Sequence, residues 1–237
     1  MLNRYVASSN SLIVATAILA LWCVTLSSLL CCDLRATHPL VVFLGIILQT
    51  FLDTGLFITA HEAMHGLVFP QNPKLNYRFG LLVIFLYGFF SYEKLLSNHW
   101  LHHSHPASID DPDFHNGKDA RCFSWYLHFL KGYWNWRKFS CSFALMILLA
   151  YIFHLAAINI GLFWALPLGL SSLQLFYFGT FLPHRQPLGG YKNFHRANST
   201  NLPIFWSFLS CYHFGYHREH HEHPDVPWWQ LPQLHSK

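Results

Sequence analysis

The chain has 237 residues, which is enough for one domain covering residues 1–237. Hydrophobic residues make up 53% of it and charged residues only 11%, whereas soluble domains usually contain about 25% charged residues. This composition excludes an ordinary water-soluble globule and predicts an integral membrane protein that contacts the lipid bilayer. The net charge of +4 is small, and no basic stripe is interleaved with aromatic residues, which excludes nucleic acid as a partner.

Four apolar segments are long enough to cross a hydrocarbon core, which takes about 20 helical residues. They are residues 12–30, 40–60, 141–159 and 161–182. The last two are separated near Asn159 and Gly161, where we expect a tight turn between two helices. A further apolar stretch, residues 79–90, is too short to cross alone and is predicted to be interfacial or re-entrant. The expected fold is all-α, with about four transmembrane helices.

The basic residues predict the orientation in the membrane. They concentrate between the second and third spans and after the fourth, whereas the loop after the first span contains Arg35 alone. Because positively charged loops stay on the cytoplasmic side, we expect both termini and the long middle segment to face the cytoplasm. Residues 123–139 mix aromatic residues such as Trp125 and Trp136 with basic ones, which predicts an aromatic belt in the membrane interface.

Histidine is unusually abundant, with 18 residues against 11 acidic ones. Eight histidines fall into three groups with helical spacing: His61 and His65, then His99, His102 and His103, and finally His217, His220 and His221. Residues at i, i+3 and i+4 share one helix face, so each group presents its imidazoles together. All three groups fall on the predicted cytoplasmic side. A tetrahedral zinc ion uses about four ligands, so these histidines predict a di-metal site, held in a histidine-rich cytoplasmic cap.

The first group also matches H-E-x-x-H, the signature of zinc metalloproteases, with Glu62 in the position of the general base. A membrane zinc protease is therefore an alternative interpretation. It requires only one further ligand and leaves both later groups without a role. Asp53 lies on the same predicted helix, about two turns before the motif, and the later spans contain no acidic residue in a protease-like setting.

Coordination by imidazole alone suits iron, copper, zinc or nickel. A nitrogen-ligated site set in hydrocarbon favours two irons that activate dioxygen against unreactive C–H bonds. The sequence contains no Gly-rich dinucleotide motif and no iron–sulfur cysteine run. We therefore expect the electrons to come from a separate donor protein.

The flanks of the histidines resemble the membrane fatty acid desaturase and hydroxylase superfamily, and more narrowly the bacterial-type β-carotene ketolases (carotenoid 4-ketolases). The similarity is carried by HEAMHGLVFP (61–70), NHWLHHSHPAS (98–108), DDPDFH (110–115), FGTFLPHR (178–185) and CYHFGYHREHHEHPDVPWWQLP (211–232). Generic desaturases share the histidine spacing, whereas the last two flanks are typical of the ketolases.

This resemblance implies a di-iron enzyme that converts the C4 methylene of carotenoid β-ionone rings to a ketone, turning β-carotene into echinenone and canthaxanthin. Dioxygen is the implied co-substrate and ferredoxin the implied electron donor. The irons are expected on the eight grouped histidines, and the superfamily pattern adds a further histidine before the third group, for which His184 is the candidate. A carotenoid hydroxylase or an acyl-lipid desaturase of the same superfamily is the alternative.

Polar residues beside the histidine groups are candidates for orienting the ligands through hydrogen bonds. They are Glu62, His105, Asp111, His213, Glu219 and His223. Many family members have Asp where this chain has Glu62, and we interpret this acid as such a partner rather than as a base. The substrate tunnel is expected to open into lipid, with walls formed by Leu67, Phe69, Phe85, Phe89 and Phe178.

Overall fold

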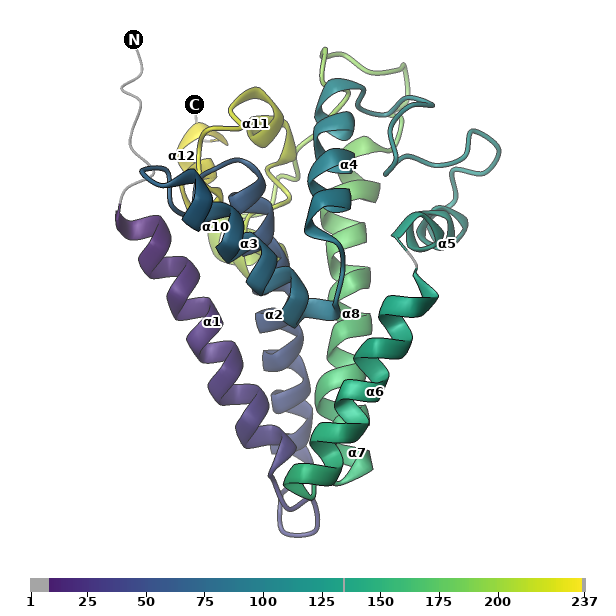
Figure 1. Ribbon diagram of the computed structural model, residues 1–237. Helices are drawn as coiled ribbons and strands as arrows, with labels where there is room; N and C mark the ends of the chain where they lie inside the picture. Colours follow the sequence, from purple (N-terminus) through teal and green to yellow (C-terminus); the bar gives the residue numbers. More distant parts are fainter. Residues whose placement is uncertain (1–8, 134, 236–237) are drawn as a thin grey trace.

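The computed structural model describes residues 9–133 and 135–235. Within these residues the fold is all-helical, as predicted, and contains no strand. Figure 1 shows long helices that converge at one end of the molecule and shorter helices gathered toward the opposite end. The predicted cytoplasmic location of the termini concerns residues 1–8 and 236–237, which lie outside the described residues.

Four helices in the described residues are long and apolar enough to cross a membrane, which confirms the predicted number. The first three are α1 (Ser9–Leu30), α2 (Pro39–Met64) and α6 (Trp136–Phe153). The fourth is a continuous run of α7 (Ala157–Ile160), the π-helical turn η1 (Gly161–Ala165), α8 (Leu166–Phe176), the π-helical turn η2 (Tyr177–Phe181) and α9 (Leu182–His184). Exposed apolar side chains such as Val24, Phe43 and Ile147 cover these helices, as contact with lipid requires.

The break between the third and fourth spans lies earlier than predicted. α6 ends because His154 adopts the left-handed conformation (φ 53°) that terminates a helix. Asn159 therefore lies within the fourth span, where its side-chain amide donates to the carbonyl oxygens of Leu30 at 3.0 Å and Cys32 at 2.8 Å. The prediction of a turn at Asn159 was wrong, because this side chain caps the end of α1 instead.

Two shorter helices, α3 (Pro73–Gly88) and α4 (Tyr92–Ser104), form a bent pair. They meet at an angle of 102°, where Phe89 adopts a left-handed conformation (φ 60°) and the Ser91 side chain accepts a hydrogen bond from the first turn of α4. The helix that contains most of the apolar stretch 79–90 ends at this bend, and the interfacial or re-entrant position of this stretch stays a prediction. The bend directs α4 toward the end of the molecule where α2 terminates (Figure 1).

The C-terminal elements lie at that same end (Figure 1). They are α10 (Ile204–Cys211), α11 (His217–Glu222), the 3-10 turn η3 (Trp228–Gln230) and α12 (Leu231–His235). Buried residues of this region, including Tyr212 and Leu231, join the same hydrophobic core as Leu56 of α2. The core thus fixes the C-terminal segment over the end of α2.

Helix α5 (Cys122–Tyr133) and the start of α6 contain the predicted aromatic belt. Phe123 and Trp136 are 72% and 70% exposed, which suits a membrane interface. Trp125 differs, because it is 1% exposed and its Nε1 donates to the carbonyl oxygen of Asp113 at 2.8 Å. This residue holds the segment 110–115 against α5 instead of facing lipid.

Candidate metal centre

The last turn of α2 supplies the first two histidines. His61 and His65 are four residues apart, so their rings lie on one face with centroids 4.9 Å apart. The helix stops at this point because Gly66 adopts a φ of 76°, which glycine takes without strain. Both side chains therefore project from a fixed helix end.

Five histidines converge on one point, and we call them the pentad: His61, His65, His99, His103 and His220. One ring nitrogen of each lies within 4.8 Å of the others. The Nε2 atoms of His65 and His99 are 2.6 Å apart, and those of His103 and His220 are 3.1 Å apart. Nitrogens bound about 2.0–2.1 Å from a common ion have similar separations, so the pentad fits one metal ion.

Four other histidines, all buried, form a second cluster that we call the tetrad: His102, His184, His217 and His221. The Nε2 atom of His221 is 3.1 Å from the Nε2 atoms of both His102 and His217. The ring of His184 packs 4.6 Å from that of His102. The structure therefore places His184, the additional predicted ligand, in this second cluster.

The helices α4 and α11 each contribute to both clusters. Each helix gives an i, i+4 pair to one cluster and a single histidine to the other. The pairs are His99/His103 from α4 and His217/His221 from α11, and the single histidines are His102 and His220. Adjacent helical residues are rotated by about 100°, which explains why neighbours in an H-x-x-H-H sequence serve different clusters.

The nitrogens of both clusters are suited to metal binding. Both ring nitrogens of His61 and the Nε2 atom of His184 are buried without a hydrogen-bond partner among the described residues, an unfavourable state unless a ligand engages them. Burial lowers the pKa of His65 to about 3. Burial and neighbouring imidazoles lower the pKa of His220 and His221 well below the ordinary value. These rings are neutral at pH 7, as metal ligation requires.

Hydrogen bonds fix two rings of the tetrad. The Nδ1 atom of His102 lies 3.0 Å from each carboxylate oxygen of Asp111, which also accepts from the backbone N–H of Ala107 at 2.9 Å. The Nδ1 atom of His184 donates to the carbonyl oxygen of Arg196 at 3.0 Å. Both contacts use the Nδ1 atom of the ring, so the Nε2 atom can bind a metal.

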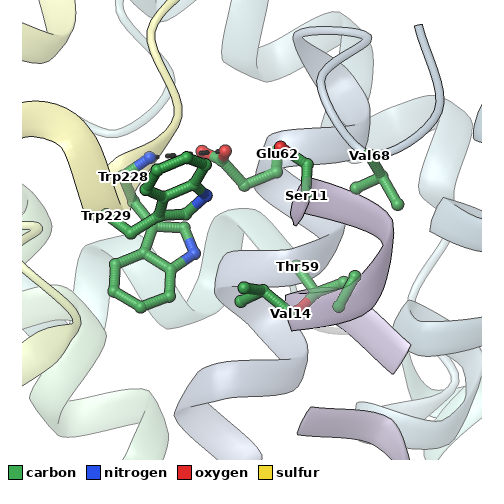
Figure 2. A pocket seen from close by; sticks show the side chains of 8 residues that line it. Ser11, Val14, Thr59, Glu62, Val68, Trp228 and Trp229 are labelled. Carbon is green, nitrogen blue, oxygen red and sulfur yellow. Dashed lines mark hydrogen bonds between the residues drawn. The ribbon is translucent and has the colours of Figure 1, made fainter. Parts of the chain in front are cut away.

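Glu62 turns toward the C-terminal segment (Figure 2). Its Oε2 accepts from the backbone N–H of Trp228 at 3.4 Å, and its Oε1 lies 3.9 Å from Nδ1 of His61. Beside it is a small cavity of about 10 Å³, lined by residues that include Ser11 and Trp229. Glu62 thus connects the end of α2 to the C-terminal segment, and its role in orienting His61 stays a prediction.

The side chain of Glu219 makes its hydrogen bonds with segments that neighbour α11. Its carboxylate accepts a hydrogen bond from the Ser199 hydroxyl, and its Oε1 lies 2.9 Å from Nδ1 of His235. These partners come from the loop before α10 and from α12. Glu219 therefore ties α11 to its neighbours, and none of these hydrogen bonds reaches a clustered imidazole.

The three remaining predicted partners lie away from the clusters. His213 stacks on Tyr216, with ring centroids 5.7 Å apart. His105 is exposed and His223 is half-buried, and neither side chain makes a hydrogen bond with another described residue. Their proposed part in orienting ligands stays a prediction.

His195 lies beside the tetrad although no motif points to it. Its ring centroid is 5.8 Å from that of His221, and its Nδ1 atom is buried without a hydrogen-bond partner among the described residues. The residue comes from the irregular segment after α9, where no helical periodicity relates it to another histidine. Only the fold brings it to the site.

A cavity of about 440 Å³ extends from both clusters. At its inner end lie His61, His99, His102 and His217, and most of the remaining lining is apolar, as in Phe57, Leu95, Leu168 and Leu175. Phe214 closes one side by packing on His61, with ring centroids 4.8 Å apart. A Cβ atom at Gly179 would lie 2.5 Å from the Phe214 ring, so only glycine permits this packing.

The cavity opens between two membrane-spanning helices. Phe139 of α6 and both Ala165 and Gly169 of the fourth span line the cavity and are also exposed. Polar residues such as Lys94 are exposed in the lining as well, and the predicted lateral entrance from the lipid stays a prediction. Among the predicted wall residues, Phe89 lines the cavity.

The other predicted walls were wrong: Leu67, Phe69, Phe85 and Phe178 are not among the lining residues. Phe85 shows why, because it is 46% exposed on the outer side of α3. Hydrophobicity near a histidine group does not reveal which helix face a residue occupies. The way in which α3 packs before its bend to α4 determines which of its residues face the cavity.

The geometry also bears on the zinc protease alternative. His61 and His65 join a cluster of five imidazoles, which is more than a catalytic zinc uses. Asp53 is 4% exposed and accepts a hydrogen bond from Trp22 Nε1 at 2.6 Å. This acid links α2 to α1 and is not directed toward the histidines, so it supplies no further protease ligand.

Known proteins are similar to this chain in sequence. The family model described as fatty acid desaturase matches residues 37–237. A β-carotene ketolase of Paracoccus sp. (strain N81106 / MBIC 01143) is 40% identical over 237 residues, covering 97% of this chain and 94% of that protein. Another β-carotene ketolase, of Paracoccus sp. (strain PC1), is 42% identical over 224 residues, with coverages of 92% and 88%. The zeaxanthin 4-ketolase of Chlamydomonas reinhardtii is 39% identical over 186 residues, covering 77% of this chain and 41% of that protein. The chain therefore belongs to the fatty acid desaturase family and, within it, to the carotenoid ketolases.

Proposed function

We propose that this protein is a di-iron β-carotene ketolase, which oxidises the C4 methylene of a β-ionone ring to a ketone. The observation that carries the proposal is that histidines of the pentad and the tetrad line a largely apolar cavity, which is bordered by exposed residues of two membrane-spanning helices. A site for a soluble, polar substrate would not open between two membrane-spanning helices. A carotenoid is dissolved in the lipid, so its ring would enter between these helices.

Residues of this chain position the substrate ring next to the histidine clusters. The cavity holds one end ring and the adjoining polyene, while the rest of the long substrate stays in lipid. Phe214, packed on His61 and His217 with ring centroids 4.8 and 5.3 Å apart, limits how the ring approaches the ligands. Apolar walls such as Leu168 and Leu175 exclude water from the reacting carbon. Fixing the ring against the clusters in this way favours oxidation at a single carbon.

The histidines are proposed to hold two irons, one in the pentad and one in the tetrad. When bound, the irons would supply the activation of dioxygen needed to break the allylic C–H bonds. Two successive hydroxylations of the same carbon give a geminal diol, which loses water to form the ketone. The reducing equivalents come from an external donor, which we propose to be ferredoxin. We place the active site and both termini on the cytoplasmic side, as the basic loops predict.

Pigment analysis in cells that make β-carotene tests the proposal. Cells that express this chain are expected to accumulate echinenone and canthaxanthin, whereas cells with an empty vector retain β-carotene. Zeaxanthin as the main product would identify a hydroxylase instead. Unchanged β-carotene, in cells where the protein is present in the membrane, would contradict carotenoid oxidation altogether.

Metal analysis of the purified protein separates the oxygenase from the protease. The proposal predicts iron in both clusters and little zinc. A single zinc per chain without iron would favour the metalloprotease interpretation of His61, Glu62 and His65.

A further inference from the structure

The segment between α9 and α10 covers the tetrad. The Tyr191 hydroxyl donates to the carbonyl oxygen of His184 at 2.6 Å, and Nδ1 of His184 donates to the carbonyl oxygen of Arg196 at 3.0 Å. His195 packs against His221. Residues 185–196, which we call the basic segment, are therefore anchored directly on metal-binding residues.

The outer surface of the basic segment carries positive charge around apolar side chains. Arg185, Lys192 and Arg196 are exposed, and residues 185–218 contain no acidic residue. Leu188 is fully exposed and Phe194 is 86% exposed. Apolar groups within a charged rim are typical of a protein interface.

A neighbouring acid reduces this charge without cancelling it. Arg196 Nη1 donates to the carbonyl oxygen of Ala107 at 3.1 Å, which brings the segment 107–111 alongside. Asp110 of that segment is exposed. The surface therefore keeps an excess of positive charge and favours an acidic partner.

Aromatic rings connect this surface to the tetrad. The rings of Phe194 and His195 have centroids 5.4 Å apart, and those of His195 and His221 are 5.8 Å apart. A protein bound over Phe194 is thus separated from the imidazole of His221 by two side chains, those of Phe194 and His195.

We propose that the basic segment is the docking surface for an acidic one-electron carrier protein, seated over Phe194 and His195. The inference rests on the proposed function, which consumes electrons that we expect a separate donor protein to supply. At each encounter the reduced iron–sulfur cluster of the carrier would lose one electron and be oxidised, and an iron bound by the tetrad would accept that electron. The location of the segment supports a water-soluble partner, because the connection after the fourth span lies at the end of the molecule opposite the turn between α6 and α7 (Figure 1).

Charge reversal tests the docking surface. The double variant Arg185→Glu/Lys192→Glu is compared with Lys74→Glu/Lys118→Glu, which changes the net charge equally at exposed positions outside the basic segment. The probe is a small acidic [2Fe–2S] carrier protein, and its Kd is measured on the full-length, iron-loaded protein in zwitterionic nanodiscs at low ionic strength. We expect roughly tenfold weaker binding for the first double variant. The control should stay within about twofold of the wild type. Unchanged iron content and thermal midpoint show that each variant is folded.

Three results would overturn the proposal. Equal weakening by both double variants would show a diffuse effect of net charge, and no detectable binding of the carrier to the wild type would exclude an acidic partner. A dye on Leu188→Cys that is quenched by brominated lipid, and is not shielded by the carrier, would assign the segment to the membrane. Failure of the proposed function gives a different result. Cells would then contain no ketocarotenoids, while charge reversal in the basic segment would still weaken binding of the carrier.

Discussion

At the scale of single residues, the site depends on which way each imidazole points. His102 and His103 are adjacent in the chain but belong to different clusters, because the helix rotates one away from the other. His102 is held by Asp111, whereas His105, only three residues on, is exposed. Proximity to the motif in the sequence therefore does not show whether a histidine joins a cluster.

Replacing His102 with Ala should abolish ketocarotenoid formation and lower the iron content, because the tetrad loses one of its four ligands. His128→Ala, at an exposed position on α5, is the matched control and should behave as the wild type. Pigment extraction and iron analysis of the same membrane preparations measure both effects. Normal turnover by His102→Ala would contradict the assignment of this residue as a ligand.

Asp111→Asn should weaken metal retention by roughly 10- to 100-fold, because the amide keeps the shape of the side chain but loses the charge that orients His102. Asp110→Asn, at the exposed neighbouring position, should leave retention unchanged. Iron loss during a timed challenge with a chelator is the appropriate measurement. If both variants lose iron at the wild-type rate, Asp111 has only a packing role.

At the scale of helices, short elements are positioned by side chains from distant parts of the sequence. α11 is a six-residue helix, too short to be stable by itself. Glu219 secures it through Ser199 and His235. The end of α1 is secured in the same manner by Asn159.

Asn159→Leu should destabilise the protein by about 1–3 kcal/mol, because carbonyl groups at the end of α1 lose their donor within an apolar region. The thermal unfolding midpoint in detergent should fall accordingly. Ile158→Ala is a suitable control, since Ile158 is 59% exposed and its truncation should change stability by less than about 0.5 kcal/mol. An equal decrease in both variants would argue against the capping role.

The sequence alone was sufficient for the helical class, the four spans and the eight histidines that the structure gathers into two clusters, because apolar length and i, i+4 spacing are local properties. His184 was expected only from the family resemblance. The sequence was insufficient for features that depend on how separate helices pack against one another. Asn159 resembles a turn residue until its carbonyl partners on α1 are known. The assignment of His220 to the pentad and the presence of His195 beside the tetrad depend on how separate segments pack.

At the scale of the whole molecule, the fold joins the end that carries both histidine clusters to a cavity bordered by two membrane-spanning helices. The bent α3–α4 pair returns His99, His102 and His103 to the end of α2. The fourth span runs from the opposite end of the bundle to His184, and its exposed Gly169 borders the cavity on the way. One helix thus contributes both to the cavity, which is the proposed substrate entrance, and to the tetrad.

Gly169→Trp should obstruct this entrance, because nothing lies within 4 Å of a Cβ atom there and the indole has space to occupy the cavity. We expect ketocarotenoid formation to fall by roughly 10- to 100-fold while iron content stays normal. Leu170→Trp places the same side chain at a neighbouring exposed position outside the lining and should have little effect. Similar losses in both variants would show that bulk on α8 disturbs the fold rather than the entrance.

The contribution of α4 and α11 to both clusters has a consequence for assembly. A first ion bound in either cluster must hold α4 and α11 together, since each cluster takes ligands from both. That ion also orders the ligands of the empty cluster, so the second ion binds to a site whose conformational entropy is already reduced. Loading is therefore expected to be cooperative, and molecules that contain a single ion should be scarce. Maturation of the protein would then proceed in one step, from an ensemble without metal to a complete centre.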